Sequence, residues 1–122
     1  MKLHLTTAEN HHLITGYDAN FIEVNKQRYV QSLIVTPEQL ILDWQVPDFA
    51  SITEANFIKI AMLNAEVVLL GSGKKHQFLH PKIYQSLTQQ GIPLECMTTA
   101  AACRTYNILM SEGRNVVAAL II

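Results

Sequence analysis

The sequence has 122 residues and a net charge of −1, and 49% of its residues are hydrophobic while 16% are charged. This length is typical of one domain, so we expect residues 1–122 to form a single domain that folds without a metal ion, cofactor or disulfide. The charged fraction lies below the ~25% of an average globular chain. A charge-poor surface leaves room for apolar association, either with an unknown protein partner or with a second copy of the chain.

Charge distribution and apolar content argue against nucleic-acid binding and against a membrane-spanning or secreted protein. The longest basic run is Lys74-Lys75, which argues against nucleic-acid binding through phosphates. No apolar run reaches the ~18 residues of a membrane span, and residues 1–10 lack the apolar core of a signal peptide. Cys96 and Cys103 are expected to be reduced and buried. We therefore expect a cytoplasmic protein without membrane insertion.

The first third of the chain is predicted to be a meander of antiparallel strands. Runs rich in β-branched and aromatic residues predict strands over residues 13–17, 21–24, 28–35 and 40–44. Asn25-Lys26-Gln27 is predicted to be a hairpin turn between two of them. Thr36-Pro37-Glu38 is predicted to be another turn, because proline presets the backbone angle that a turn requires.

The rest of the chain alternates between helix and strand. Ser51 and Glu54 have the spacing of a capping box, which predicts a helix over residues 52–64. A second helix is expected from Pro81 to the glycine at position 91. Apolar runs over residues 67–70, 94–97 and 115–122 predict strands, the last of them central in its sheet. This interleaving predicts an α/β fold with a partly parallel sheet.

A third helix is expected to begin at Thr98 or Thr99 and to end at Gly113. Its apolar side chains predict one buried face, on which Cys103 also lies, and its polar side chains predict an opposite, solvated face. The buried face is predicted to contain Ala102, Tyr106, Leu109 and Met110, and the solvated face Arg104, Asn107 and Ser111.

The end of the chain carries a long motif. It reads ECMTTAAACRTYNIL from Glu95 to Leu109 and EGRNVVAAL from Glu112 to Leu120. This motif resembles the signature of a domain family that includes the mitochondrial NADH:ubiquinone oxidoreductase (complex I) assembly factor 3, an adipogenesis-associated protein and many small uncharacterised bacterial proteins. Upstream matches extend the resemblance over nearly the whole chain; they are Gly16-Tyr17, Val24-Asn25, Tyr29, Ser32-Leu33-Ile34-Val35, Pro37, Trp44 and Leu69-Leu70-Gly71-Ser72-Gly73.

The resemblance implies a three-layer fold, in which helices pack on a mixed five-stranded central sheet, next to the N-terminal β-meander. It implies no reaction, since the family has no established enzymatic activity. The sequence lacks the N-terminal extension expected of a mitochondrial member, so we expect a small bacterial member of the family.

Two segments lie where α/β proteins bind ligands, which is beyond the carboxyl ends of strands. Gly71-Ser72-Gly73-Lys74 follows a buried predicted strand, and glycines there let backbone N–H groups cradle an anion. A dinucleotide fingerprint needs a third glycine where His76 stands, and a P-loop needs Ser or Thr after Lys74. The segment is therefore either a structural turn or a contact for a small anion or ligand.

Thr98-Thr99 occupies the equivalent place after the next strand, at a helix N-terminus that offers free N–H donors. If the two strands are parallel neighbours, both segments open at the same edge of the sheet. Arg104, in the second helical turn, would supply positive charge. In the alternative interpretation, the threonines only cap the helix and Arg104 is solvated.

Other chemically active residue types form no complete site in the sequence. His76 and His80 are four residues apart, but Pro81 predicts an extended segment, so they are expected to be structural or surface histidines and no metal site is predicted. His11-His12 is interpreted in the same way, as part of a loop. Neither cysteine has a recognisable catalytic partner, so no catalytic residue is assigned.

Two functions are compatible with the sequence. The first is a non-enzymatic interaction or assembly factor, related to a respiratory complex through the family resemblance. The second is a protein that binds a small anion or ligand, or a weak enzyme, using Gly71, Ser72, Gly73, Lys74, Thr98, Thr99 and Arg104.

Overall fold

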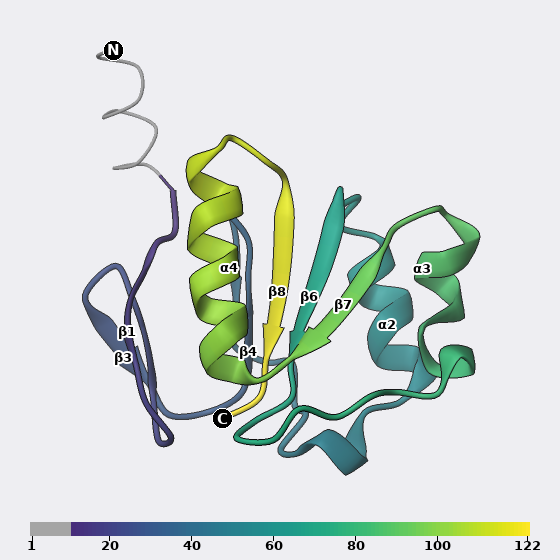
Figure 1. The fold of residues 1–122 in the computed structure, drawn as a ribbon, viewed down its shortest axis with the longest axis horizontal. Helices are drawn as coiled ribbons and strands as arrows, with labels where there is room; N and C mark the ends of the chain where they lie inside the picture. The colour runs from purple at the N-terminus through teal and green to yellow at the C-terminus, as the bar shows by residue number, and fades with distance from the viewer. Residues whose placement is uncertain (1–10) are drawn as a thin grey trace.

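A computed structural model describes residues 11–122 of the chain. The central element is a mixed sheet with the strand order β5-β4-β8-β6-β7 (Figure 1). Its strands are β4 (Leu33–Val35), β5 (Leu40–Ile41), β6 (Val67–Gly71), β7 (Leu94–Met97) and β8 (Val116–Leu120). β6 runs parallel to both β7 and β8, whereas β4 runs antiparallel to β5 and β8. The predicted α/β fold with a mixed five-stranded sheet is confirmed.

The two central strands are the most apolar ones. Every residue of β6 and of β8 is buried, as their uninterrupted apolar runs predict for strands covered on both faces. β8 lies between β4 and β6, so the prediction that the last strand is central is confirmed.

A small antiparallel sheet with the order β1-β2-β3 forms the predicted N-terminal meander. Its strands are β1 (Ile14–Tyr17), β2 (Ile22–Val24) and β3 (Gln27–Tyr29). The predicted turn between β2 and β3 is centred on Asn25 and Lys26, whose φ angles are 49° and 74°. Two consecutive positive φ angles are the geometry of a tight hairpin turn that matches the strand twist.

The predicted strand over residues 28–35 is wrong. This run is divided between β3 in the small sheet and β4 in the central sheet. Val30, in the connection, is 75% exposed. An apolar β-branched residue extends the strand signal along the sequence, but it cannot show that the chain passes from one sheet to another. The predicted strand over residues 40–44 is shorter in the structure and ends at Ile41.

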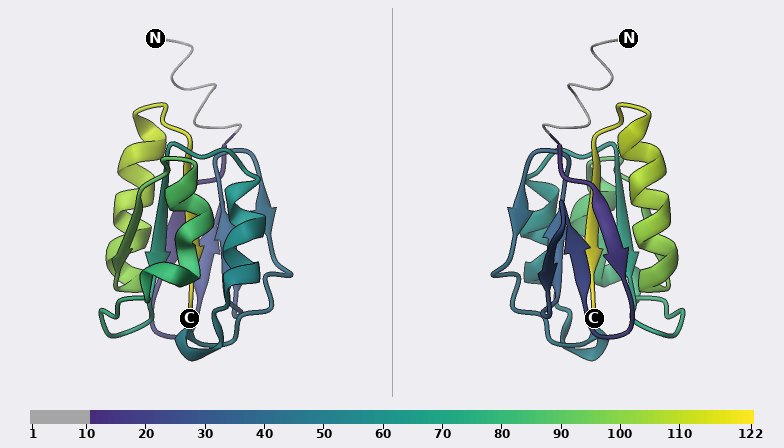
Figure 2. Two further views of the ribbon diagram at one scale, coloured as in Figure 1. Left: turned by 90° about the vertical axis from the view of Figure 1, so that its right-hand side faces the viewer. Right: turned by 90° about the vertical axis from the view of Figure 1, so that its left-hand side faces the viewer.

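Helices cover both faces of the central sheet (Figure 2). α4 (Thr99–Ser111) packs with the small sheet on one face, around Tyr106, Cys103 and the inward residues of β4, β6 and β8. α2 (Glu54–Ala61), η2 (Pro81–Tyr84) and α3 (Gln85–Gln89) lie on the other face, where Phe57, Trp44 and Leu87 are buried. Two cores therefore sandwich the sheet, which is the predicted three-layer arrangement.

The capping box predicted at Ser51 and Glu54 is wrong. The N-cap of α2 is Thr53, whose N–H donates to Asn56 Oδ1 at 2.7 Å. Ser51 instead ends a separate short 3-10 helix, η1 (Phe49–Ser51), and its hydroxyl donates to the Asp48 carboxylate at 2.7 Å. Ser51 and Thr53 both have the sequence pattern of a helix N-cap. Because the Asp48 carboxylate binds Ser51, Thr53 is the residue that caps α2.

α4 begins and ends as predicted, since Thr98 is its N-cap and Gly113, with φ 80°, closes it. Within the helix, the solvated position predicted for Asn107 is wrong. The Asn107 amide accepts the N–H of Ile14 at 3.0 Å and donates to the Ile14 carbonyl at 2.7 Å. The Asn107 side chain thus pairs with the β1 backbone as a neighbouring strand would, and it holds the small sheet against α4.

Candidate functional site

The two candidate segments meet at one edge of the central sheet. β6 and β7 are parallel neighbours, with Gly71 paired to Met97. The Ser72 N–H donates to the Met97 carbonyl at 2.8 Å, and the Thr99 N–H donates to the Gly73 carbonyl at 3.0 Å. The loops after the two strands are therefore in direct contact, and the expected shared edge is confirmed.

The Thr99 hydroxyl joins three segments at this edge. It donates to the Ile121 carbonyl at 2.6 Å and accepts the Gly73 N–H at 2.8 Å. The neighbouring Thr98 hydroxyl accepts the Ala101 N–H at 3.3 Å as the helix cap. Thr98 therefore caps the helix, as the alternative interpretation expected, whereas the Thr99 hydroxyl joins the loop after β6 to the residue after β8.

Gly71 is required by the close approach of α4 to β6. A Cβ atom placed on Gly71 would lie 2.9 Å from both Cα and Oγ1 of Thr99, which is closer than nonbonded carbon atoms approach. Ser72 is also structural. Its side chain is buried, its Oγ lies 2.5 Å from the Lys75 carbonyl oxygen, and it accepts the Gln77 N–H at 3.2 Å. Gly71 and Ser72 therefore determine the conformation of the loop after β6 and are not exposed for ligand contact.

A cavity of about 320 Å³ opens in front of this loop. It is lined by Tyr17, Asp18, Ala19, Gly73, Lys74, Thr98, Thr99, Ala100, Ile121 and Ile122. Four predicted site residues, Gly73, Lys74, Thr98 and Thr99, thus lie together on its wall. Arg104 is not on the wall, and its guanidinium donates to the Tyr17 hydroxyl at 3.2 Å.

The remaining wall residues come from parts of the chain that the site prediction did not include. Tyr17, Asp18 and Ala19 belong to β1 and the turn after it, and Ile121 follows β8. No local motif marks them as ligand contacts. The match of Gly16-Tyr17 to the family pattern was the one signal in the sequence that pointed to this turn.

The cavity combines a few polar groups with apolar walls. Within residues 11–122 the Ala100 N–H has no hydrogen-bond acceptor, and Lys74 is exposed. The Asp18 carboxylate is engaged, since it accepts the N–H groups of Asn20 and Phe21 at 2.7 and 3.2 Å. An anionic group bound here would meet a helix N-terminus and an ammonium group.

The thiols and the histidines do not converge on this cavity. Burial raises the pKa of the Cys96 thiol and raises that of Cys103 to about 12, so both thiolates are disfavoured. The His76 ring contacts the Phe78 ring in a tilted arrangement, with a centroid distance of 4.4 Å, and His80 Nδ1 accepts the Lys82 N–H at 3.1 Å. Across residues 11–122, no group of three His, Cys, Asp or Glu side chains is placed to hold a metal ion.

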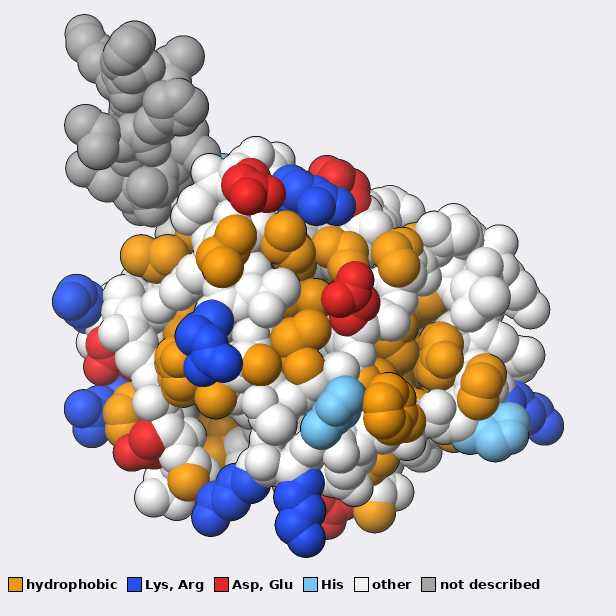
Figure 3. All heavy atoms as spheres, viewed as in Figure 1, with side chains coloured by type: hydrophobic (Ala, Val, Ile, Leu, Met, Phe, Trp, Pro, Cys, Tyr) orange, Lys and Arg blue, Asp and Glu red, His pale blue; other side chains and the backbone are white. Residues whose placement is uncertain are grey.

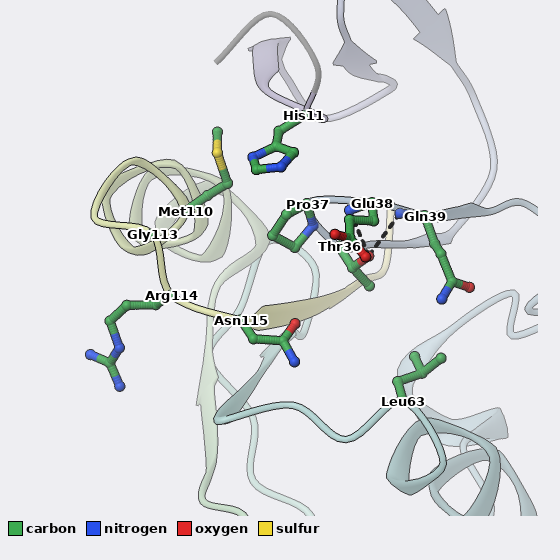
Figure 4. Close-up of a pocket in the computed structure, with 10 residues that line it drawn as sticks. All are labelled: His11, Thr36, Pro37, Glu38, Gln39, Leu63, Met110, Gly113, Arg114 and Asn115. Atoms are coloured by element: carbon green, nitrogen blue, oxygen red, sulfur yellow. Dashed lines mark hydrogen bonds between the residues drawn. The ribbon is translucent and has the colours of Figure 1, made fainter. Parts of the chain in front are cut away.

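A second cavity, of about 290 Å³, lies at the opposite end of β8 (Figure 4). It is lined by His11, Thr36, Pro37, Glu38, Gln39, Leu63, Met110, Gly113, Arg114 and Asn115. His11 Nδ1 is buried without a hydrogen-bond partner among the described residues, whereas Arg114 points away from the cavity and pairs with Glu66 at 3.4 Å. The sequence contained no signal for this cavity, because its walls come from five separate segments.

No helix in residues 11–122 is both long enough and apolar enough to cross a bilayer.

Comparisons with known proteins identify relatives over most of the chain. Assembly factor 3 of the NADH dehydrogenase [ubiquinone] 1 alpha subcomplex from Mus musculus is 36% identical over 110 residues, which are 88% of this chain and 59% of that protein. The chain therefore spans less than two thirds of that relative's length. A "13 kDa major membrane protein" from Francisella tularensis is 34% identical over 96 residues, which are 76% of each chain.

Solved structures show the same architecture. The crystal structure of a protein from Bordetella parapertussis is 39% identical, has a TM-score of 0.86, and is matched over 91% of this chain and 95% of that one. A family model described as "Protein of unknown function (DUF498/DUF598)" matches residues 14–121. The expected family resemblance is confirmed, and the chain belongs to the DUF498/DUF598 family, whose relatives include complex I assembly factors.

Proposed function

We propose that this chain is a non-enzymatic interaction protein of the assembly-factor type, and that its partner is a subunit of a respiratory NADH dehydrogenase. Homology to the complex I assembly factors supports an assembly-factor-like role. The nature of the partner follows from the names of these relatives and is part of the proposal.

The observation that carries the proposal is an apolar stripe on the outer face of α2. Ala55, Ile58 and Met62 are exposed there, Ile58 by 50% and Met62 by 73%. They follow the helical spacing of one face, while Phe57 and Ile60 are buried on the other. A helix with apolar side chains on both faces fits a protein that covers the outer face with a partner.

The test compares two aspartate substitutions at exposed apolar positions. Ile58→Asp disrupts the stripe on α2, whereas Val30→Asp lies in the connection between β3 and β4 and serves as the matched control. Tagged chains are recovered from their own cells after crosslinking, and the NADH dehydrogenase subunits bound to them are quantified. We expect at least about a tenfold loss of these subunits for Ile58→Asp, since central interface residues contribute more than 1 kcal/mol each.

Two results would contradict the proposal. One is recovery of the unsubstituted chain alone after a salt wash, repeatedly. The other is equal recovery of the same subunits with Ile58→Asp and with Val30→Asp. Both variants should fold, because the side chains that change are exposed.

A second candidate function is supported by the cavity beside Lys74 and Thr99. Its position between the two segments singled out in the sequence favours a site for a small carboxylate or phosphate with an apolar part, because Tyr17, Ala19 and Ile121 line the rest of the wall. The same cavity would serve a weak enzyme acting on such a ligand.

Nuclear magnetic resonance titration tests this second candidate. Inorganic phosphate and short-chain carboxylates are added to the labelled protein, and we expect shifts of the N–H signals of Gly73 and Ala100. Lys74→Ala should abolish the shifts, whereas Lys75→Ala, whose side chain does not line the cavity, should retain them. No shift at millimolar ligand would remove this candidate.

A further inference from the structure

The loop between β6 and η2 presents an aromatic ring among cationic side chains. Residues 67–94 contain three lysines and two histidines, but no aspartate or glutamate. Three of the nine basic residues of the chain are thus placed in this loop and in η2, as Lys74, Lys75 and Lys82. Figure 3 shows lysine or arginine side chains at the lower edge of the molecule, next to an acidic side chain, and a histidine beside a hydrophobic side chain above them.

Phe78 is the most exposed large hydrophobic side chain of the described residues, at 77%. Its exposure is imposed by contacts on both sides. The preceding Gln77 is held by the buried Ser72, through its N–H at 3.2 Å and its side-chain amide at 3.3 Å. The following Leu79 is partly buried and packs against the core that contains Phe57 and Leu87. The ring lies against the His76 ring, at a centroid distance of 4.4 Å.

The neighbouring side chains reinforce this arrangement. Lys74 and Lys75 are exposed just before Phe78, and His80 and Lys82 are exposed just after it. The loop thus exposes one aromatic ring that is flanked along the chain by lysine and histidine side chains. Neither the cavity near Thr99 nor the one near His11 includes Phe78, so its ring is not the wall of a concave site for a small ligand.

We propose that this loop binds the protein peripherally to an anionic lipid surface. The Phe78 ring inserts among the lipid headgroups, and Lys74, Lys75 and Lys82 lie against the lipid phosphates. Aromatic rings favour the interface between headgroups and acyl chains, and lysines near an anionic leaflet are attracted to its surface potential. This binding is independent of the proposed partner site on α2.

Shape and charge favour a lipid surface over a nucleic acid. Single-stranded nucleic acids are bound in a basic groove with several stacking rings, whereas this loop exposes one ring, which lines neither of the two cavities described above. The chain as a whole has a net charge of −1, and its basic residues are not concentrated enough for many phosphate contacts. An exposed aromatic side chain flanked by a few lysines suits a deformable anionic surface.

Vesicle sedimentation tests the proposal with the complete chain. We expect binding to phosphatidylcholine vesicles that contain about one third phosphatidylglycerol, and at least about tenfold weaker binding to phosphatidylcholine alone. Phe78→Ala, and the pair Lys74→Glu with Lys75→Glu, should each weaken binding about tenfold or more. Salt at about 0.5 M should release the protein, because it screens the charges.

Matched controls separate this surface from the rest of the molecule. Val30→Ala removes an equally exposed apolar side chain from the connection between β3 and β4, and Lys26→Glu reverses a charge in the β2–β3 turn. Both should bind vesicles like the unsubstituted protein. In a second readout, a tryptophan introduced by Phe78→Trp should shift its fluorescence to the blue on anionic vesicles, whereas Val30→Trp should not.

Four results would overturn the proposal. They are no sedimentation with anionic vesicles at low salt, equal sedimentation with neutral vesicles, unchanged binding by Phe78→Ala, and binding of a single-stranded oligonucleotide in place of vesicles. We expect Ile58→Asp to lose the protein partner and to keep vesicle binding, because the two surfaces act separately.

Discussion

Gly71→Ala tests whether close packing of α4 on β6 sets the geometry of the strand-end site. The added Cβ would lie 2.9 Å from the Thr99 Cα and 3.1 Å from the Leu120 side chain. Relief requires movement of a backbone atom, because the Thr99 Cα cannot rotate away. Overpacking of this kind costs about 1–3 kcal/mol, and for a chain of this size the Tm should fall by roughly 4–12 °C.

Thermal and urea unfolding measure this effect, with Gly16→Ala as the control. A Cβ on Gly16 would meet Glu23 at 3.5 Å, which is ordinary van der Waals contact, so its stability should change little. We also expect shifted N–H signals at Gly73 and Ala100 for Gly71→Ala only. An equally stable Gly71→Ala protein with unchanged signals would refute the close-packing argument.

Three further substitutions test other parts of the structure. Thr99→Val keeps the shape of the side chain but removes the hydroxyl that joins the ends of β6 and β8, so urea unfolding should show a loss of about 1–3 kcal/mol. Asn107→Ala removes both hydrogen bonds to the Ile14 backbone, so amide hydrogen exchange in β1 should become faster than in β6. Burial raises the pKa of Cys103 from 9.0 to about 12, so the thiol stays protonated to a higher pH in the folded state than in the unfolded chain. The stability that the protonated thiol contributes is complete below pH 9 and is lost as the pH rises towards 12. In Cys103→Ala, the free energy of unfolding should therefore fall less steeply over this range, by about 1.4 kcal/mol per pH unit.

Each of these expectations has a result that contradicts it. Thr99→Ser retains the hydroxyl and should be more stable than Thr99→Val, so the reverse order would count against the bridging role. Uniform acceleration of exchange after Asn107→Ala would mean that β1 is not docked locally by this side chain. An unchanged alkaline slope in Cys103→Ala would show that another group controls stability in that range.

Several elements could be predicted from the sequence because their signals are local. The uninterrupted apolar runs of β6 and β8 indicated strands buried on both faces, and the structure confirms them. Thr98 and Gly113 marked the ends of α4, because the cap hydroxyl and the positive φ act on the adjacent turn of backbone. The position of the candidate site followed from the same logic, since parallel neighbouring strands end at one edge of the sheet.

The tertiary structure alone decided how distant segments meet. The run over residues 28–35 has one continuous strand pattern, yet it contributes to two sheets, because pairing with β2 and with β8 is determined by partners elsewhere in the chain. Asn107 has the sequence pattern of a solvated helix position, but Ile14, 93 residues away, offers both a donor and an acceptor to its amide. Tyr17 reaches the cavity at Thr99 only because the small sheet packs beside α4. Periodicity and capping act over a few residues and determine which helices and strands form. The order of strands determines which side chains become neighbours, and therefore which residues line the cavity.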